Sequence, residues 1–436
     1  MVDPSIEHRD KRLASSRNSF RAACRLGFLF SFVAGLAAIS VAGDWPQILG
    51  PHRNGIADGE RLAASWPKGG PKIVWQRDVD DGVAGVAVAG GKAVLFHRSG
   101  DQELVEAMDA ATGKVLWKAA FATRFRAEVG AAGNGPRCVP LIHQNRVVVF
   151  GAGGDLHCLA LDSGKEIWSR AALREFAAPA GYFGVGSSPI VEGTKLIVNV
   201  GGSRSNAGLV AFDIATGKTV WQATDEQASY SSPTAVTLDG VRHVIFVTRY
   251  NVVSIDPDSG AVRFRFPFGA RGPTVNGATP LVIDGHVFVS SSYGVGAAFA
   301  KISGDGAKTV WANDDAMSSQ YPTAIHKDGF LYGIHGRQDA GVADLRCVEA
   351  KTGKVMWTER GFGMATLILA DGKLVIAKTD GELVLAEPSP QRFHSLASAR
   401  AFPSTVRALP ALANGRLYVR DEQALLCFDL RADTSR

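Results

Sequence analysis

Short runs of apolar, often β-branched residues recur along the chain, separated by polar turns that contain glycine. The segment 188–223 is typical, with expected strands at 189–191, 195–200, 209–213 and 218–223. Glu192-Gly193 and Ala215-Thr216-Gly217 form the turns, and the segment shows no helical periodicity. The pattern therefore predicts an all-β protein built from four-stranded units.

The third and fourth expected strands of most units share a signature, a turn ending in glycine followed four residues later by an aromatic residue. The aromatic positions lie 42 to 53 residues apart, from Trp75 to Trp357, with Phe264 replacing tryptophan once. A repeat of this length is typical of the four-stranded blades of a β-propeller. Each turn glycine is expected to take a left-handed conformation.

Counting the starts of first strands gives eight units, and six of them carry proline at that point. A strand that lines a propeller channel has one unpaired edge and tolerates proline, so these residues mark the innermost strands. The eighth unit, 410–429, lacks a fourth strand, whereas Lys72–Gln76 is a fourth strand without its first three. The two are expected to pair and close an eight-bladed ring. The prolines are Pro140, Pro189, Pro233, Pro280, Pro322 and Pro410.

The first 43 residues form a targeting segment rather than part of the propeller. Six basic residues between Arg9 and Arg25 precede an apolar or small-residue run, Leu26–Ala42, which ends before the polar Asp44. This arrangement is typical of a cleaved signal peptide, with an uncleaved membrane anchor as the alternative. We therefore expect a signal segment at 1–43, a single propeller domain at 44–436, and a periplasmic or extracellular location.

Charge and cysteine content narrow the function classes. Without residues 1–43 the chain keeps 41 basic and 39 acidic residues, a net charge near +2. A nearly neutral chain without a clustered basic stripe lacks the positive surface that nucleic-acid-binding proteins use, so this function class is excluded. Cys138, Cys158, Cys347 and Cys427 show no metal-binding spacing. Cys158, Cys347 and Cys427 are expected to be buried free thiols, whereas Cys138 belongs to a first strand, where a position facing the channel is the alternative.

The stretch 211–221, Ala-Phe-Asp-Ile-Ala-Thr-Gly-Lys-Thr-Val-Trp, resembles the repeat of the quinoprotein (pyrroloquinoline quinone, PQQ) propeller family. Asp44-Trp45-Pro46-Gln47 and Gly50-Pro51-His52-Arg53-Asn54-Gly55 are similar to the start of secreted bacterial PQQ-like repeat proteins. The resemblance implies an eight-bladed propeller whose repeat tryptophans dock one blade on the next. These docking residues are Trp75, Trp117, Trp168, Trp221, Trp311 and Trp357.

The resemblance also raises the question of catalysis. PQQ-dependent dehydrogenases of this family carry an adjacent cysteine pair and carboxylates that hold calcium, and this chain has no Cys-Cys pair. No Gly-x-Ser-x-Gly, His-Glu-x-x-His or phosphate-loop motif occurs either. We expect neither a catalytic residue nor a metal site, and no cofactor, while PQQ with calcium in an alcohol or sugar dehydrogenase remains the alternative.

The candidate functional region is the funnel mouth, formed by the loops from each fourth strand to the next first strand together with the second-to-third strand loops. Tyr, Asn and Arg residues in these loops favour binding of a protein or glycan partner. We therefore expect a monomeric scaffold protein of the cell envelope that holds its partner at the funnel mouth. The chain resembles, at fold level, propellers that help assemble outer-membrane proteins, although it lacks their lipoprotein cysteine. The simpler interpretation is that these residues only solvate a channel. The candidates are Asn134, Arg137, Tyr182, Tyr230, Arg271, Asn276, Gln320, Tyr321 and Arg407.

Overall fold

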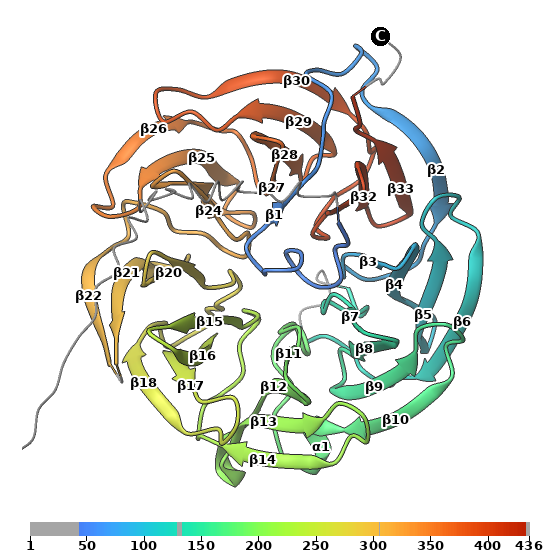
Figure 1. Ribbon diagram of the computed structural model, residues 1–436, viewed down its shortest axis with the longest axis vertical. Helices are drawn as coiled ribbons and strands as arrows, with labels where there is room; N and C mark the ends of the chain where they lie inside the picture. The colour runs from blue at the N-terminus through green and yellow to red at the C-terminus, as the bar shows by residue number, and fades with distance from the viewer. Residues whose placement is uncertain (1–42, 129–132, 305, 433–436) are drawn as a thin grey trace, which may run out of the picture. The chain divides into compact units, whose positions relative to one another are not determined.

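Eight sheets are arranged as blades around a central axis in the computed structural model (Figure 1). Each has four antiparallel strands, and one of them gains a short fifth strand in parallel. The structure describes residues 43–128, 133–304 and 306–432, which belong to one compact unit, Ser40–Arg436. The expected signal or anchor segment lies outside the described residues except for Gly43. Within them, helix is confined to the short turns α1 (Ala172–Glu175) and η2 (Ser203–Ser205), so the all-β, eight-bladed prediction is confirmed.

Each blade runs from an inner first strand to an outer fourth strand, and we number the blades 1 to 8 by their first strands (Figure 1). The first strands are β3 (Ala87–Ala89), β7 (Leu141–His143), β11 (Ile190–Glu192), β15 (Thr234–Leu238), β19 (Leu281–Ile283), β23 (Ile325–Lys327), β27 (Ala365–Ala370) and β31 (Ala411–Ala413). The second strands are β4 (Lys92–Ser99), β8 (Arg146–Phe150), β12 (Lys195–Gly202), β16 (Val241–Val247), β20 (His286–Ser291), β24 (Phe330–Arg337), β28 (Lys373–Lys378) and β32 (Arg416–Arg420).

The outer half of each blade is built in the same way. The third strands are β5 (Gln102–Asp109), β9 (Asp155–Ala160), β13 (Ala207–Asp213), β17 (Asn251–Ile255), β21 (Gly296–Ser303), β25 (Val342–Glu349), β29 (Glu382–Glu387) and β33 (Ala424–Asp429). The fourth strands are β6 (Val115–Ala122), β10 (Glu166–Ala171), β14 (Thr219–Ala223), β18 (Val262–Pro267), β22 (Gly306–Asn313), β26 (Val355–Glu359), β30 (His394–Arg400) and, for blade 8, β2 (Lys72–Asp78).

The ring closes as the sequence predicts, because β2 pairs antiparallel with β33, from Lys72 opposite Asp429 to Asp78 opposite Ala424. The prolines expected on the innermost strands lie just before them instead. Pro140, for example, directly precedes β7, and only Pro322 stands further ahead of its strand. Their missing N–H groups therefore fall where the chain enters each inner strand.

The hydrophobic core is divided into layers between neighbouring blades. One layer, for example, joins β11, β12 and β13 of blade 3 to β16 and β17 of blade 4 through buried aliphatic side chains and Phe246. Middle strands are buried on both faces, whereas fourth strands alternate between buried and exposed positions. The layering explains why middle strands read as continuous apolar runs.

The repeat motif acts between blades rather than within one. Each repeat tryptophan donates its indole N–H to a backbone carbonyl in the third-to-fourth strand turn of the following blade, at 2.8 to 3.1 Å. The turn glycine lies against the same ring, since a Cβ added to Gly217 would come within 2.7 Å of Trp168 Cδ2. Gly217 also has a φ of +70°, so conformation and packing both require glycine there.

Residues 44–62, which we call the strap, cross the centre of the ring before the chain enters β2 (Figure 1). The backbone of Trp45 exchanges hydrogen bonds of 2.7 and 2.8 Å with Val88 of blade 1, and its side chain is 1% exposed. Further along, β1 (Ile56–Ala57) adds to blade 7 in parallel with β27. Glu60 Oε2 then accepts the N–H of Gly415 in blade 8 at 2.5 Å. The strap thus ties together blades that are distant in sequence.

Arg53 anchors the strap to the inner strands. Its guanidinium, in a residue only 2% exposed, donates to the carbonyls of Ser188, Pro189 and Pro233, which belong to the starts of blades 3 and 4. Its Nε donates to Gln47 Oε1 of the strap at 2.8 Å. Burial lowers the pKa of Arg53 to about 9, and the negative charge of Glu192 partly offsets this lowering. The strap therefore fixes a guanidinium between the inner ends of two blades.

A buried ion-pair cluster holds the closing blade against blade 1. The carboxylate of Glu106, whose side chain is 6% exposed, lies 2.6 Å from Lys118 Nζ and 3.3 Å from Arg77 Nη2 of β2. His97 Nε2 lies 3.4 Å from the same carboxylate. Burial opposes ionisation, but the close approach of His97 and the ion pair with Lys118 outweigh it and lower the pKa of Glu106 to about 2.

Substitution Gly217→Ala tests the docking arrangement. A left-handed alanine costs about 1–2 kcal/mol, and pressing its Cβ against Trp168 adds about 1–3 kcal/mol. Gly193→Ala is the matched control, because Gly193 also has positive φ but faces open space. We expect Gly217→Ala to lower the free energy of unfolding in urea clearly more than Gly193→Ala. Equal losses would show that the tryptophan contact contributes nothing.

Substitution Glu106→Gln tests the seam between blades 8 and 1. A folded pKa near 2 against 4.5 means that ionised Glu106 stabilises the fold fully above pH 4.5, and that this stability fades as the pH falls toward 2. The variant should lose on the order of 3 kcal/mol at neutral pH and show a flatter stability profile in acid. Glu166→Gln removes an exposed pair with His157 and should cost about 1 kcal/mol or less. Urea unfolding at several pH values measures both, and parallel acid profiles for wild type and Glu106→Gln would contradict the assignment.

Candidate functional site

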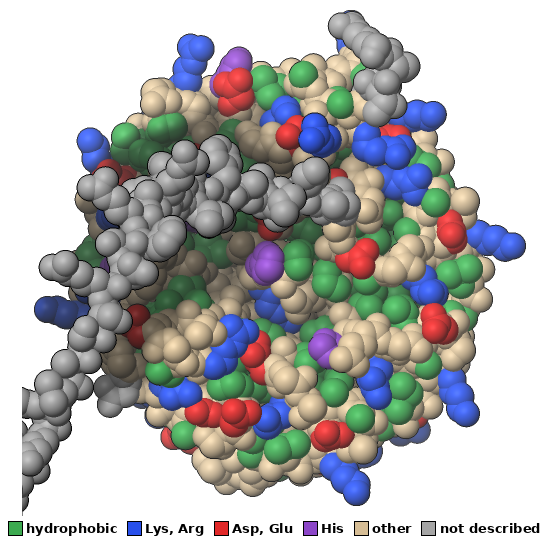
Figure 2. All heavy atoms as spheres, viewed as in Figure 1, with side chains coloured by type: hydrophobic (Ala, Val, Ile, Leu, Met, Phe, Trp, Pro, Cys, Tyr) green, Lys and Arg blue, Asp and Glu red, His purple; other side chains and the backbone are tan. Residues whose placement is uncertain are grey.

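All nine funnel residues predicted from the sequence lie in loops that join a fourth strand to the next first strand. These loops stand at the end of the channel opposite the first-to-second strand turns, near which the strap pairs with Val88 and Leu369. We call this end the funnel face. The strap side, seen in Figure 2, shows basic and acidic side chains intermingled and no basic stripe.

Three of the predicted residues make hydrogen bonds within the protein that hold the loops in place. Asn134 Oδ1 accepts the N–H of Ala127 at 2.9 Å. Asn276 is 1% exposed, and its amide donates to the carbonyl of Thr248 at 2.8 Å. Gln320 holds two loops together through hydrogen bonds of its amide nitrogen and oxygen. The polar groups of these side chains are used within the protein, so they shape the funnel rather than offer free contacts.

A second group forms an aromatic patch. The guanidinium of Arg137 stands 5.8 Å from the ring centre of Phe183, and the rings of Phe183 and Tyr230 are 5.6 Å apart. The Tyr230 hydroxyl accepts the N–H of Phe183 at 2.9 Å, which fixes the patch. Tyr182 is 42% exposed and adjoins it. The patch thus combines a cation with exposed aromatic surface.

A third group carries the positive charge. Burial lowers the pKa of Arg137, and the charge of Arg407 adds to this effect. Burial also raises the pKa of Tyr321, which Arg407 partly offsets. Arg407 Nε is buried and has no hydrogen-bond acceptor among the described residues. Arg271, by contrast, is exposed at the rim.

Sequence reasoning missed two further pairs of an arginine with an aromatic ring on this face. Arg249 lies over the ring of Tyr250 at 4.8 Å, and Arg337 over that of Tyr293 at 4.2 Å. Arg249 and Tyr250 are adjacent in a second-to-third strand loop, so the dipeptide itself was a usable signal. Arg337 and Tyr293 come from different blades, and only the folded ring brings them together.

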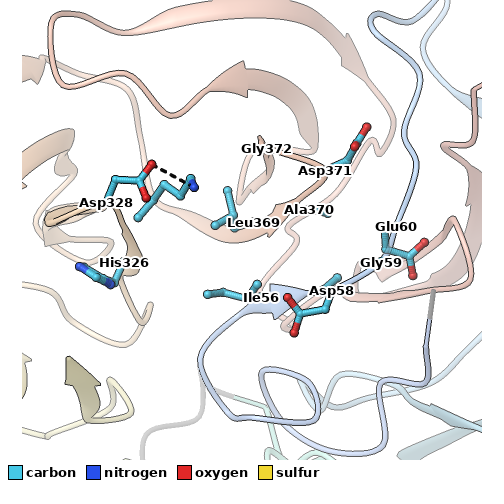
Figure 3. A pocket seen from close by; sticks show the side chains of 12 residues that line it. Ile56, Asp58, Gly59, Glu60, His326, Asp328, Leu369, Ala370, Asp371 and Gly372 are labelled. Carbon is cyan, nitrogen blue, oxygen red and sulfur yellow. Dashed lines mark ion pairs between the residues drawn. The ribbon is translucent and has the colours of Figure 1, made fainter. Parts of the chain in front are cut away.

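On the strap side a cleft of about 580 Å³ lies between β1 and the β23–β24 turn (Figure 3). Asp58 and Glu60 of the strap stand at one end of it, and His326 and Asp328 at the other. Asp328 pairs with Lys327 at 3.0 Å, and Glu60 is tied to blade 8. Most of the polar groups of the cleft are therefore engaged within the protein.

The described residues also answer two questions left by the sequence. Cys138, Cys158, Cys347 and Cys427 are buried free thiols, and burial raises their pKa values. No three His, Cys, Asp or Glu side chains within 43–128, 133–304 and 306–432 gather as metal ligands. In the same ranges, no helix has the length and apolar character needed to cross a bilayer.

Comparison with solved structures confirms the fold. BamB from Moraxella catarrhalis matches with a TM-score of 0.59 and 17% identity, over 84% of this chain and 98% of that one. Quinohemoprotein alcohol dehydrogenase from Comamonas testosteroni matches with a TM-score of 0.64 and 14% identity, over 90% and 81%. The computationally designed Ika8 protein gives a TM-score of 0.57 and 13% identity, over 83% and 100%. These identities are low enough that the likeness concerns the fold alone.

Comparison of the sequence with known families assigns this chain to one of them. No curated protein matches it, but the family model described as outer membrane protein assembly factor BamB matches residues 101–359, more than half of the chain. The match covers the blades whose Gly-x-x-x-Trp signature first indicated PQQ-like repeats. This chain belongs to the BamB family of PQQ-like β-propeller proteins.

Proposed function

We propose that this chain is a non-catalytic binding protein of the cell envelope that holds a protein partner on its funnel face. The observation that carries the proposal is the set of arginine–aromatic pairs on that face, at Phe183, Tyr250 and Tyr293. Arginine and tyrosine are enriched where protein interfaces concentrate their binding energy. The pairs sit on loops of a rigid ring, a common setting for binding residues.

The family supports a partner-binding function. Its description names an assembly factor of outer-membrane proteins, and the similar structure from Moraxella catarrhalis is a BamB. An assembly factor acts by holding other proteins, so the proposed partner of this chain is a protein rather than a glycan. The signal-like segment 1–43 favours the periplasm as the place of action. The family match does not extend to a particular partner.

A PQQ-dependent oxidoreductase is the second candidate, favoured by the likeness to quinohemoprotein alcohol dehydrogenase. PQQ with calcium needs carboxylate ligands beside the channel. The carboxylate of Asp81, whose negative charge acts to raise the pKa of Arg137, accepts the backbone N–H of Asn134 at 2.8 Å. Among the described residues, no three His, Cys, Asp or Glu side chains gather as metal ligands. The second candidate therefore rests on the shared fold.

Site-specific photo-crosslinking distinguishes the two faces of the ring. A photoreactive amino acid at Tyr182, on the funnel face, should give a discrete protein adduct in cells of the source organism. The same group at Leu116, which is 47% exposed on an outer strand, should give none. Adducts of equal yield at both positions, or at Leu116 alone, would contradict the proposal.

Calorimetric titration with PQQ and Ca²⁺ tests the second candidate. We expect no heat of binding to a protein comprising residues 40–436, which form a compact unit. Stoichiometric binding in this titration would favour the oxidoreductase, and alcohol and sugar substrates would then be tested.

A further inference from the structure

We propose that Arg407, with the positive charge of Arg137 nearby, forms an oxyanion-binding centre at the funnel mouth that takes the carboxylate of an acidic peptide segment. The inference deepens the proposed function and rests on it, because it gives the chemistry of the partner segment. It is carried by the placement of the two arginines, by the unsatisfied donor on Arg407, and by the aromatic surface beside them.

The fold places the two arginines at equivalent positions. Arg137 stands three residues before Pro140, ahead of β7, and Arg407 stands three residues before Pro410, ahead of β31. Blade 1 lies between them and has glycine in the corresponding loop. A Cβ on Gly85 would come within 2.3 Å of the Leu409 carbonyl oxygen and 3.5 Å of a Val139 methyl group. The missing side chain thus lets both arginine-bearing loops close on blade 1.

The loops that carry the two arginines pack on a small apolar cluster. Val139 and Leu409, each two residues after an arginine, pack with Ile48 and Leu49 of the strap in a small apolar cluster. The strap therefore supports the floor beneath both guanidinium groups. Such support keeps the arginines in place before a ligand arrives, which reduces the entropic cost of binding.

Arg137 already donates to the carbonyl oxygens of Gly135 and Gly133, and the negative charge of Asp81 acts on it, so the donor that is open to a ligand belongs to Arg407. The Nε of Arg407 is buried and has no hydrogen-bond acceptor among the described residues. A buried donor without an acceptor is costly, and in native structures it commonly indicates a bound water or ion. The site therefore favours a negatively charged ligand.

The surroundings select a carboxylate on a peptide. Guanidinium groups bind planar carboxylates through paired hydrogen bonds. Beside the arginines, Tyr182, Phe183 and Tyr230 offer an aromatic surface larger than an isolated ion would need. A peptide with an acidic side chain next to apolar residues can use both features at once. Free phosphate or a small carboxylate would use only the charges.

Fluorescence anisotropy with labelled hexaglutamate, phenylalanine-flanked at both ends, tests the proposal on residues 40–436. Arg407→Gln should weaken binding at least about tenfold, as expected for the loss of a charge-assisted pair. Arg204→Gln, which changes an exposed arginine in the β12–β13 loop on the same face, should leave binding unchanged. The matched hexaglutamine peptide should not bind. Equal binding by wild type and Arg407→Gln would overturn the proposal.

Two further measurements make the test decisive. The melting temperature of Arg407→Gln should be unchanged or higher, because the variant removes a buried unsatisfied donor and a like charge near Arg137. A clear fall would assign Arg407 a structural role and overturn the proposal. Inorganic phosphate should compete only at far higher concentration than the peptide, and displacement at equal concentration would show that the site takes any oxyanion.

The outcomes also separate this proposal from the proposed function. A protein adduct at Tyr182 that persists in Arg407→Gln, with hexaglutamate binding also unchanged, would leave the partner-binding function standing and refute the oxyanion centre. Hexaglutamate binding that depends on Arg407, without any adduct at Tyr182, would support the oxyanion centre and contradict the protein partner.

Discussion

The contact between a tryptophan of one blade and the turn glycine of the next is the interaction on which this ring depends. Each tryptophan buries a large apolar surface between two sheets and satisfies its single donor on a backbone carbonyl across the gap. Because the glycine lies under the ring, the contact fixes the spacing and rotation of neighbouring blades. The core layers between blades then form at a constant geometry. At Phe264 the contact lacks its hydrogen bond, because the phenylalanine ring has no N–H to donate.

The strap makes the two ends of the channel different. On its own side it adds an inner strand to blade 7, while its Arg53 reaches the starts of the first strands of blades 3 and 4. On the other side its residues Ile48 and Leu49 lie beneath the loops that bear the funnel arginines. The same segment thus fills one end of the ring and supports the binding surface at the other. The proposed function depends on this asymmetry as much as on the arginine–aromatic pairs.

Repeat spacing predicted the fold almost completely, because every blade repeats the same local pattern of strand, turn and docking residue. The funnel was predicted as a set of loops, but the direction of its side chains was not. Asn276 and Gln320 are the residue types of an interface, yet the fold uses both inside loops. The function of Arg53 could not be predicted either, since its acceptors lie 135 to 180 residues away in sequence. Contacts of that kind depend on the closed ring.

The pairing of β2 with β33 joins the two ends of the propeller, and this has a consequence for the order of folding. Lys72 finds its partner only when Asp429 is available, so blade 8 remains incomplete until nearly the whole chain is present. Contacts between such distant residues require a large loop to close and slow the folding of β proteins. The early blades can assemble from local hairpins, while β2 and the strap wait. Until β2 pairs with β33, the outer edge of blade 8 is unpaired, and an unpaired strand edge is a template for aggregation.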